Sequence, residues 1–161
     1  MSRVFTYLEA PIMNINTSTL NPKIRIVNFD DDNAAQIINV RHAVFTIEQK
    51  IDDKEDLDGR DPTAIHALAT INNETIGTGR MTNDGHIGRL VVLKKHRHQG
   101  IGSAIVNALI IEAKKSKLQN IYLGAQISAI GFYRKNGFEE YGEIFQEVEI
   151  DHIMMKKDIT K

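Results

Sequence analysis

The residues best suited to chemistry in this sequence lie between positions 86 and 102. An apolar run, His86–Leu93, leads into a basic turn that contains Arg97, and Gly100-x-Gly102 then opens an amphipathic stretch. Glycine allows the backbone to approach a ligand closely, and the first N–H groups of a helix are unpaired and carry about half a positive charge. This combination predicts an anion site suited to a pyrophosphate.

Two well-known phosphate-binding motifs do not fit this turn. A Rossmann fingerprint requires a third Gly or Ala where the chain has Ile105, and a P-loop requires Gly-Lys-Ser/Thr where Gly102 is followed by Ser103-Ala. What remains is Arg97-x-x-Gly100-x-Gly102 in a strand–turn–helix context. The six-residue pattern is common by chance, so its context and a second motif carry the argument.

That second motif lies in residues 129–138, which read Ala-x-x-Phe-Tyr-x-x-x-Gly-Phe. Together the two segments resemble the GCN5-related N-acetyltransferase (GNAT) superfamily. Residues 23–161 follow the order of elements of that superfamily. The nearest resemblance is to its ElaA-type branch, through four stretches in order. These are residues 41–49, 56–59, 122–126 and 150–154.

The resemblance implies an acetyl-CoA-dependent N-acetyltransferase that moves an acetyl group to the primary amine of a small molecule or peptide. It implies direct attack in a ternary complex, and the absence of cysteine agrees because no thiol can hold the acetyl group. A non-catalytic acyl-CoA-binding regulatory module is the alternative function, and a protein-interaction domain that binds no CoA is a third.

The resemblance also assigns residues to acetyl-CoA binding, on the strand, the basic turn, the helix start and the second motif. They are Leu90, Val91, Val92, Arg97, His98, Gln99, Gly100, Ile101, Gly102, Ser103, Gln126 and Tyr133. Two positions depart from the superfamily pattern. Lys94 stands where many members have Pro, and Gln126 stands where many have Asn.

Two residues are the candidate catalytic groups. Tyr133 is the candidate proton donor to the leaving thiolate, because a phenol with a pKa near ~10 stays protonated at neutral pH; its structural alternative is a core aromatic. Glu48 is the candidate base, with a plain surface charge as its alternative. His66 and His152 are further candidates, since histidine titrates near neutral pH.

Packed acids between Asp52 and Asp61, around Gly59, favour a solvated loop. Steering of a cationic amine and cation binding are the alternatives, although the EF-hand spacing is absent. His96 and His98 in the basic turn could suggest a metal, but no third ligand lies near them in the sequence, and we expect no metal site.

The composition is that of an ordinary globular domain: 161 residues, a net charge of −1 and no cysteine. Near-neutral charge argues against a general nucleic-acid binder, and no apolar run reaches the ~20 residues of a membrane span. We therefore expect a cytoplasmic protein without nucleic-acid or membrane partners; a homodimer is left open. Residues 1–22 predict a flexible extension, and residues 23–161 the N-acetyltransferase domain.

Hydrophobic periodicity predicts the elements that position these residues. A strand is expected at 23–27, followed by a helix from a cap within Asp30–Asn33 (with Gln36 completing a capping box) to near Ile47. The elements expected after this helix are strands at 64–72, 75–82 and 86–93, a helix at 100–117, a strand at 120–123, a helix at 128–136 and two strands within 139–157. This order predicts an α/β fold of the α+β type, a mixed and mainly antiparallel central sheet flanked by helices.

Overall fold

A computed structural model describes residues 21–161 of the chain. Its elements, in chain order, are β1 (Lys23–Val27), α1 (Asp31–Arg41), the π-helix η2 (His42–Glu48), α2 (Asp53–Asp56), η3 (Asp61–Thr63), β2 (Ile65–Ile71), β3 (Glu74–Met81), β4 (Ile87–Val92), η4 (Lys94–His96), α3 (Ile101–Lys115), β5 (Asn120–Gln126), η5 (Ile127–Ala129), α4 (Ile130–Lys135), β6 (Glu139–Glu147) and β7 (Ile150–Asp158). The extension predicted for residues 1–22 lies, up to residue 20, outside the described residues. No helix within residues 21–161 combines the length and apolarity that a membrane crossing requires.

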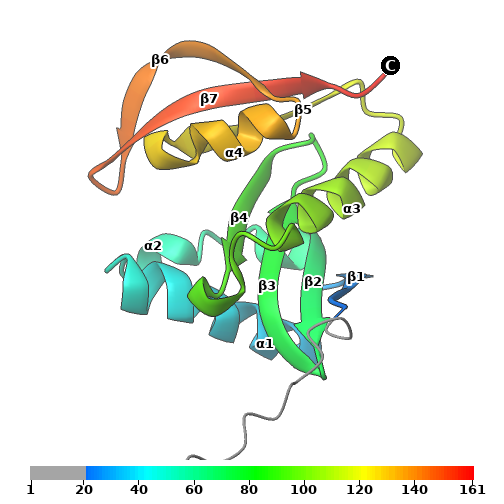
Figure 1. Cartoon of the computed structure of the whole chain (residues 1–161), viewed down its shortest axis with the longest axis vertical. Coiled ribbons are helices and arrows are strands. Elements are labelled where there is room, and N and C mark those ends of the chain that lie inside the picture. Colours follow the sequence, from blue (N-terminus) through cyan, green and yellow to red (C-terminus); the bar gives the residue numbers. More distant parts are fainter. Residues whose placement is uncertain (1–20) are drawn as a thin grey trace, which may run out of the picture.

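The strands form two antiparallel sheets, which Figure 1 shows as separate layers. One sheet has the order β1-β2-β3-β4, and the other has the order β5-β7-β6. Between β4 and β5 there is a single parallel bridge, His86 to Tyr122, beside a hydrogen bond from the Tyr122 N–H to the Gly85 carbonyl at 3.0 Å. The antiparallel α/β fold is confirmed, with the central sheet opened between its fourth and fifth strands.

Helix α3 supplies much of the core that holds the two sheets together. Its apolar stripe places Ile105 and Leu109 at 0% exposure, packed with residues of β2, β3, β5 and β7. The exposed face carries Asn107, Lys114 and Lys115, as the 3.6-residue period predicts, together with Ile111, which is 55% exposed. Because α3 starts directly after the turn that follows β4, its amino terminus is held at the open end of the sheet.

Three local features differ from the sequence-based expectation. The first helix is α-helical only to Arg41 and continues as the π-helix η2. Asp30 caps it by accepting from the Asn33 N–H at 3.2 Å, whereas Gln36 forms no capping box and accepts from the Thr75 hydroxyl instead. Strand β5 runs on to Gln126, which brings that residue to the edge of the opening.

Candidate functional site

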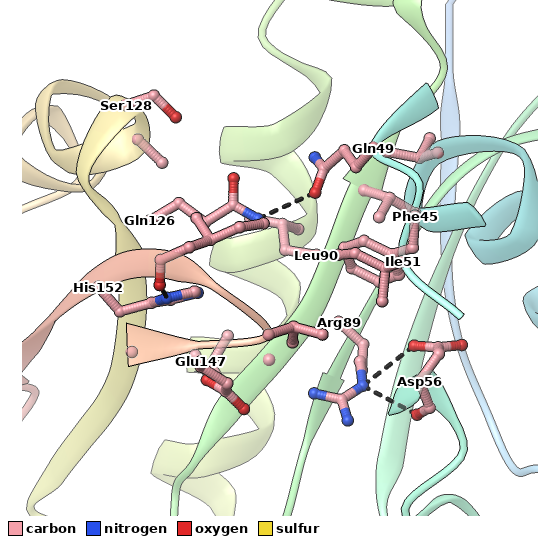
Figure 2. A pocket seen from close by; sticks show the side chains of 18 of the residues that line it. Phe45, Gln49, Ile51, Asp56, Arg89, Leu90, Gln126, Ser128, Glu147 and His152 are labelled. Atoms are coloured by element: carbon pink, nitrogen blue, oxygen red, sulfur yellow. Dashed lines mark hydrogen bonds and ion pairs between the residues drawn. The ribbon is translucent and has the colours of Figure 1, made fainter. Parts of the chain in front are cut away.

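A cavity of about 650 Å³ lies where β4 and β5 diverge. Figure 2 shows side chains entering it from three directions: Leu90 from β4, Gln126 and His152 from the second sheet, and Phe45 and Gln49 from η2 and the residue after it. Apart from the bridge at His86, β4 has no partner strand on this side within the described residues. An edge strand presents unpaired N–H and C=O groups, so the cavity has a polar backbone wall.

Strand β4 carries a β-bulge at the centre of this wall. Thr78 pairs with Val91 and Arg80 pairs with Gly88, so one residue of β3 faces both Arg89 and Leu90. Arg89 has φ of 50°, in the left-handed region that costs a residue with a Cβ roughly 1–2 kcal/mol. Such a conformation persists only where its surroundings hold it, and a bulge re-aims the backbone groups beside it.

Two aspartates hold Arg89 in this conformation. Its Nε lies 3.1 Å from Asp56 Oδ1 and also donates to the Asp56 carbonyl at 3.1 Å, and its second terminal nitrogen donates to Asp58 Oδ2 at 3.3 Å. Figure 2 shows Arg89 and Asp56 together at the floor of the cavity. The segment after η2 is therefore tied directly to the bulge in β4.

The same aspartates belong to a larger cluster of charges, of which Arg41, Asp56, Asp61 and Arg80 are buried. Arg41, which is fully buried, donates to Asp56 at 2.9 Å and to Asp61 at 2.8 Å. Arg80 donates to both oxygens of Asp58 at 2.8 Å and to Asp61 at 3.1 Å. Three arginines thus balance three aspartates, and we call these six residues the Arg–Asp cluster. Its members are Arg41, Asp56, Asp58, Asp61, Arg80 and Arg89.

The Arg–Asp cluster shifts the acidity of its carboxyl groups. The hydrogen bonds from Arg80 hold the pKa of Asp58 well below its ordinary value. For Asp61, burial acts upwards, but Arg41 and Arg80 together bring its pKa below the ordinary value. The expectation of a solvated acidic loop is wrong for Asp56 and Asp61, which are 8% and 3% exposed, because buried guanidinium groups compensate their charge.

The predicted base, Glu48, lies outside the cavity lining and contacts the predicted pyrophosphate residue. Its two carboxylate oxygens accept from the terminal nitrogens of Arg97, each at 2.6 Å, while Arg97 Nε donates to the Val92 carbonyl at 2.9 Å. The hydrogen bond from Arg97 lowers the pKa of Glu48. A carboxylate in such a pair is a weak base, so the structure supports a role for Glu48 in holding Arg97 rather than in accepting a proton.

The amino terminus of α3 has no side-chain cap. Gly100 is the N-cap residue with φ of +80°, a left-handed conformation that suits glycine, and a Cβ there would meet nothing within 4 Å. Ile101 is 2% exposed and packs into the core, so only its backbone can face a ligand. The first N–H groups of the helix therefore remain available for an anion.

Tyr133 lies on α4 and lines the cavity. It is 9% exposed, packs edge-to-face against Phe132 and Phe138, and burial raises its pKa. Its hydroxyl makes no hydrogen bond with any residue of the described range, although its side chain lines the cavity. Tyr133 is thus both a core aromatic and a cavity residue.

The structure brings about half of the predicted acetyl-CoA residues to the cavity and the rest to the turn before α3. Those in the cavity lining are Leu90, Val91, Val92, Arg97, Gln126 and Tyr133. Those that do not line it are His98, Gln99, Gly100, Ile101, Gly102 and Ser103, at the start of α3. The amide of Gln126 is engaged across the cavity, donating to Gln49 Oε1 at 3.0 Å (Figure 2).

Sequence reasoning assigned no role to Arg89 or Gln49, and it placed His152 second to Glu48. The available signal for Gln49 and His152 was that they lie within stretches that carry the ElaA-type resemblance, and for Arg89 that it lies in the stretch 86–102 that leads into the basic turn. Among the other candidates, His66 is fully buried on β2, bonded to the Asp61 carbonyl at 2.9 Å, and does not line the cavity.

Comparison with known proteins agrees with this geometry. The sequence model of the acetyltransferase (GNAT) domain matches residues 38–159. The chain belongs to the GNAT acetyltransferase family. The N-acetyltransferase expected from the sequence is thereby confirmed, and acyl transfer is the general chemistry of the family. The resemblance to the ElaA-type branch is confirmed by Protein ElaA of Escherichia coli (strain K12), which is 28% identical over 134 residues, 78% of this chain and 87% of that protein.

Individual members of the GNAT family extend the comparison. A Bacillus subtilis (strain 168) protein named uncharacterized N-acetyltransferase YjcF is 33% identical over 123 residues, which are 74% of this chain and 88% of that protein. The crystal structure of Escherichia coli ElaA has a TM-score of 0.77 at 25% identity and covers 86% of this chain and 100% of its own. An aminoglycoside 6'-N-acetyltransferase complexed with coenzyme A has a TM-score of 0.69 at 20% identity, covering 85% of this chain and 98% of its own.

Proposed function

We propose that the protein transfers an acetyl group from acetyl-CoA to a primary amine by direct attack in a ternary complex. One observation carries the proposal: the sheet opens between β4 and β5 at the end where the uncapped amino terminus of α3 begins. The backbone wall of β4 and the anion site of α3 therefore lie next to each other. Acetyl-CoA requires such an arrangement, because one molecule carries both the thioester and the pyrophosphate. The GNAT neighbour complexed with coenzyme A supports this assignment.

The residues present fit the pyrophosphate of CoA. The open space at Gly100 and the free N–H groups of α3 form an anion cradle, and Arg97 with Lys94 brings positive charge to its rim. Glu48 reduces that charge while it pairs with Arg97, and its hydrogen bonds hold the guanidinium in one orientation. These residues would bind and orient the cofactor, which supplies an activated acyl thioester when bound.

The exposed edge of β4 around Leu90–Val92 would stabilise the charge that develops on the thioester oxygen. Preorganised hydrogen-bond donors contribute a few kcal/mol to such transition states, about 2.7–4 for one side-chain donor in a protease. The bulge at Arg89 sets which backbone groups of β4 face the cavity. This assignment keeps the predicted roles of Leu90, Val91 and Val92 as backbone contacts.

Tyr133 would return a proton to the departing thiolate. Burial raises its pKa, so the hydroxyl is protonated at neutral pH and has no competing partner among the described residues. A general acid at this step contributes typically ~10²–10⁴-fold to the rate. We therefore expect Tyr133→Phe to lower kcat by that order while acetyl-CoA binding is retained.

The test combines calorimetric titration of acetyl-CoA with a thiol-release assay against polyamines, amino sugars, amino acids and peptide amines. Binding together with amine-dependent thiol release supports the proposal. Binding without thiol release across the panel would favour the regulatory acyl-CoA-binding module, and no binding at millimolar acetyl-CoA would exclude both. Cytoplasmic location and oligomeric state stay predictions from the sequence.

A further inference from the structure

His152 is a buried histidine that reaches the cavity from the second sheet. It lies on β7 between Gln126 of β5 and Phe145 of β6, its register partners on either side. It is 7% exposed, and its ring stacks on Phe145 at 5.7 Å between centroids. Figure 2 shows it beside Gln126 in the cavity, with Glu147 on the same side.

The hydrogen bonding of His152 decides which ring nitrogen is available. Nδ1 lies 2.7 Å from the Ile150 carbonyl oxygen. A carbonyl only accepts hydrogen bonds, so Nδ1 carries the hydrogen, and Nε2 of the neutral ring has a free lone pair. Nε2 has no hydrogen-bond partner within residues 21–161. A ring nitrogen with a free lone pair on a residue that lines the cavity is suited to accept a proton.

The cavity lining contains a second histidine, His86, which lies at a different end of the cavity from His152. His86 stacks on Tyr122 at 4.8 Å, at the closed end where β4 and β5 are bridged. His152 faces Gln126, four residues further along β5, which at a strand rise of about 3.3 Å per residue is roughly 13 Å away. That end of β5 leads directly into the segment with Tyr133, where we place the thioester.

We propose that His152 is the base that takes the proton from the acceptor amine, an inference that rests on the proposed acetyl transfer. Nε2 accepts one proton from the ammonium group, and the neutral nitrogen attacks the carbonyl carbon. The C–N bond forms and the C–S bond breaks. Tyr133 gives its proton to the sulfur and is reprotonated by the proton that the nitrogen loses as the amide forms. His152 then releases its proton to water.

The experiment uses His152→Asn in the full-length protein. Asparagine retains a donor near the position of Nδ1 for the Ile150 carbonyl but has no basic nitrogen. His42→Asn is the matched control, because His42 is exposed, pairs with Asp53 and lies outside the cavity. Two substrates are used. The first is the amine of the panel that is acetylated fastest. The second is its analogue with fluorine beside the amine, whose amino group is mostly neutral in the assay buffer.

For His152→Asn we expect kcat/KM to fall by about 10²–10⁴-fold with the ordinary amine, the usual contribution of a general base. The loss with the fluorinated amine should be at least tenfold smaller, because that amine needs no base. Imidazole in the buffer should restore part of the activity of His152→Ala. A variant that merely disturbs packing should lose activity with both amines by the same factor, and imidazole should not restore that activity.

Two results would overturn the assignment, and they are distinguishable from each other. Suppose that the wild-type protein acetylates amines of the panel. If His152→Asn then keeps its activity, or loses activity with both amines by the same factor, His152 is not the base. If wild-type protein releases no thiol with any amine, the proposed acetyl transfer itself fails. His42→Asn should match the wild type with both amines.

Discussion

Replacing Arg41 by methionine should strongly destabilise the fold, because Arg41 is the deepest member of the Arg–Asp cluster. Its side chain is 0% exposed and donates to Asp56 at 2.9 Å, to the Asp56 carbonyl at 3.1 Å and to Asp61 at 2.8 Å. Arg41→Met keeps most of the length of the side chain and removes every donor. Two arginines then face three aspartates, and one buried negative charge has no compensation.

The expected cost follows from that uncompensated charge. Removing one partner of a buried ion pair costs about 3–5 kcal/mol, a large part of the ~5–15 kcal/mol that stabilises a typical domain. Urea unfolding followed by circular dichroism measures the free energy of unfolding. Arg134→Met is the control, because Arg134 pairs with Glu140 at the surface, where ion pairs contribute little.

A double-mutant cycle separates charge from packing. Asp61→Asn in the Arg41→Met background restores the balance, with Arg80 and Arg89 facing Asp56 and Asp58. We therefore expect the two substitutions together to cost less than the sum of the single ones, by about 0.5–3 kcal/mol. Strictly additive effects, or an Arg41→Met variant as stable as Arg134→Met, would refute the reasoning.

Two further changes test other parts of the structure. In Gly102→Val the added Cβ would lie 3.1 Å from the Phe132 ring, so the start of α3 and the ring must move apart. We expect calorimetry to show at least tenfold weaker binding of acetyl-CoA, because its anion site is placed at that helix start. Unchanged affinity would contradict the placement. Hydrogen bonds from Thr82 and Tyr122 lower the pKa of Asp84 to about 2. The stability they contribute is present above about pH 4, where the carboxyl of an unfolded chain ionises, and is lost as the pH falls from there through the folded-state pKa. In Tyr122→Phe, NMR titration should find a higher pKa for Asp84, and an unchanged value would show that the tyrosine contributes nothing.

Much of the fold could be predicted because the signals are local. The apolar stripe of α3 and the alternation in β1 depend on the residues themselves and their spacing. The chemistry of the turn before α3 is local too, since Arg97 and Gly100 lie within one strand–turn–helix segment. Those elements formed where the pattern placed them, with differences of a few residues at their ends.

The acidic stretch shows where local reasoning stops. Aspartates around a glycine are typical of solvated loops, and nothing in their own spacing indicates burial. Their partners, Arg41 and Arg80, lie 15 to 20 positions away, so only the folded chain pairs Asp56 and Asp61 with them. The pairing of Glu48 could not be predicted for the same reason, because its partner Arg97 is 49 positions away.

The family of this protein, its element order and the chemistry of the turn before α3 follow from the sequence alone, since short segments of the chain carry those features. The folded chain was needed to establish how the sheet opens, that Arg89 takes a left-handed conformation, and that His152 rather than Glu48 reaches the cavity. Those features depend on contacts between distant segments. The free energies of ion pairs and hydrogen bonds are set by burial and distance, which a linear sequence does not contain.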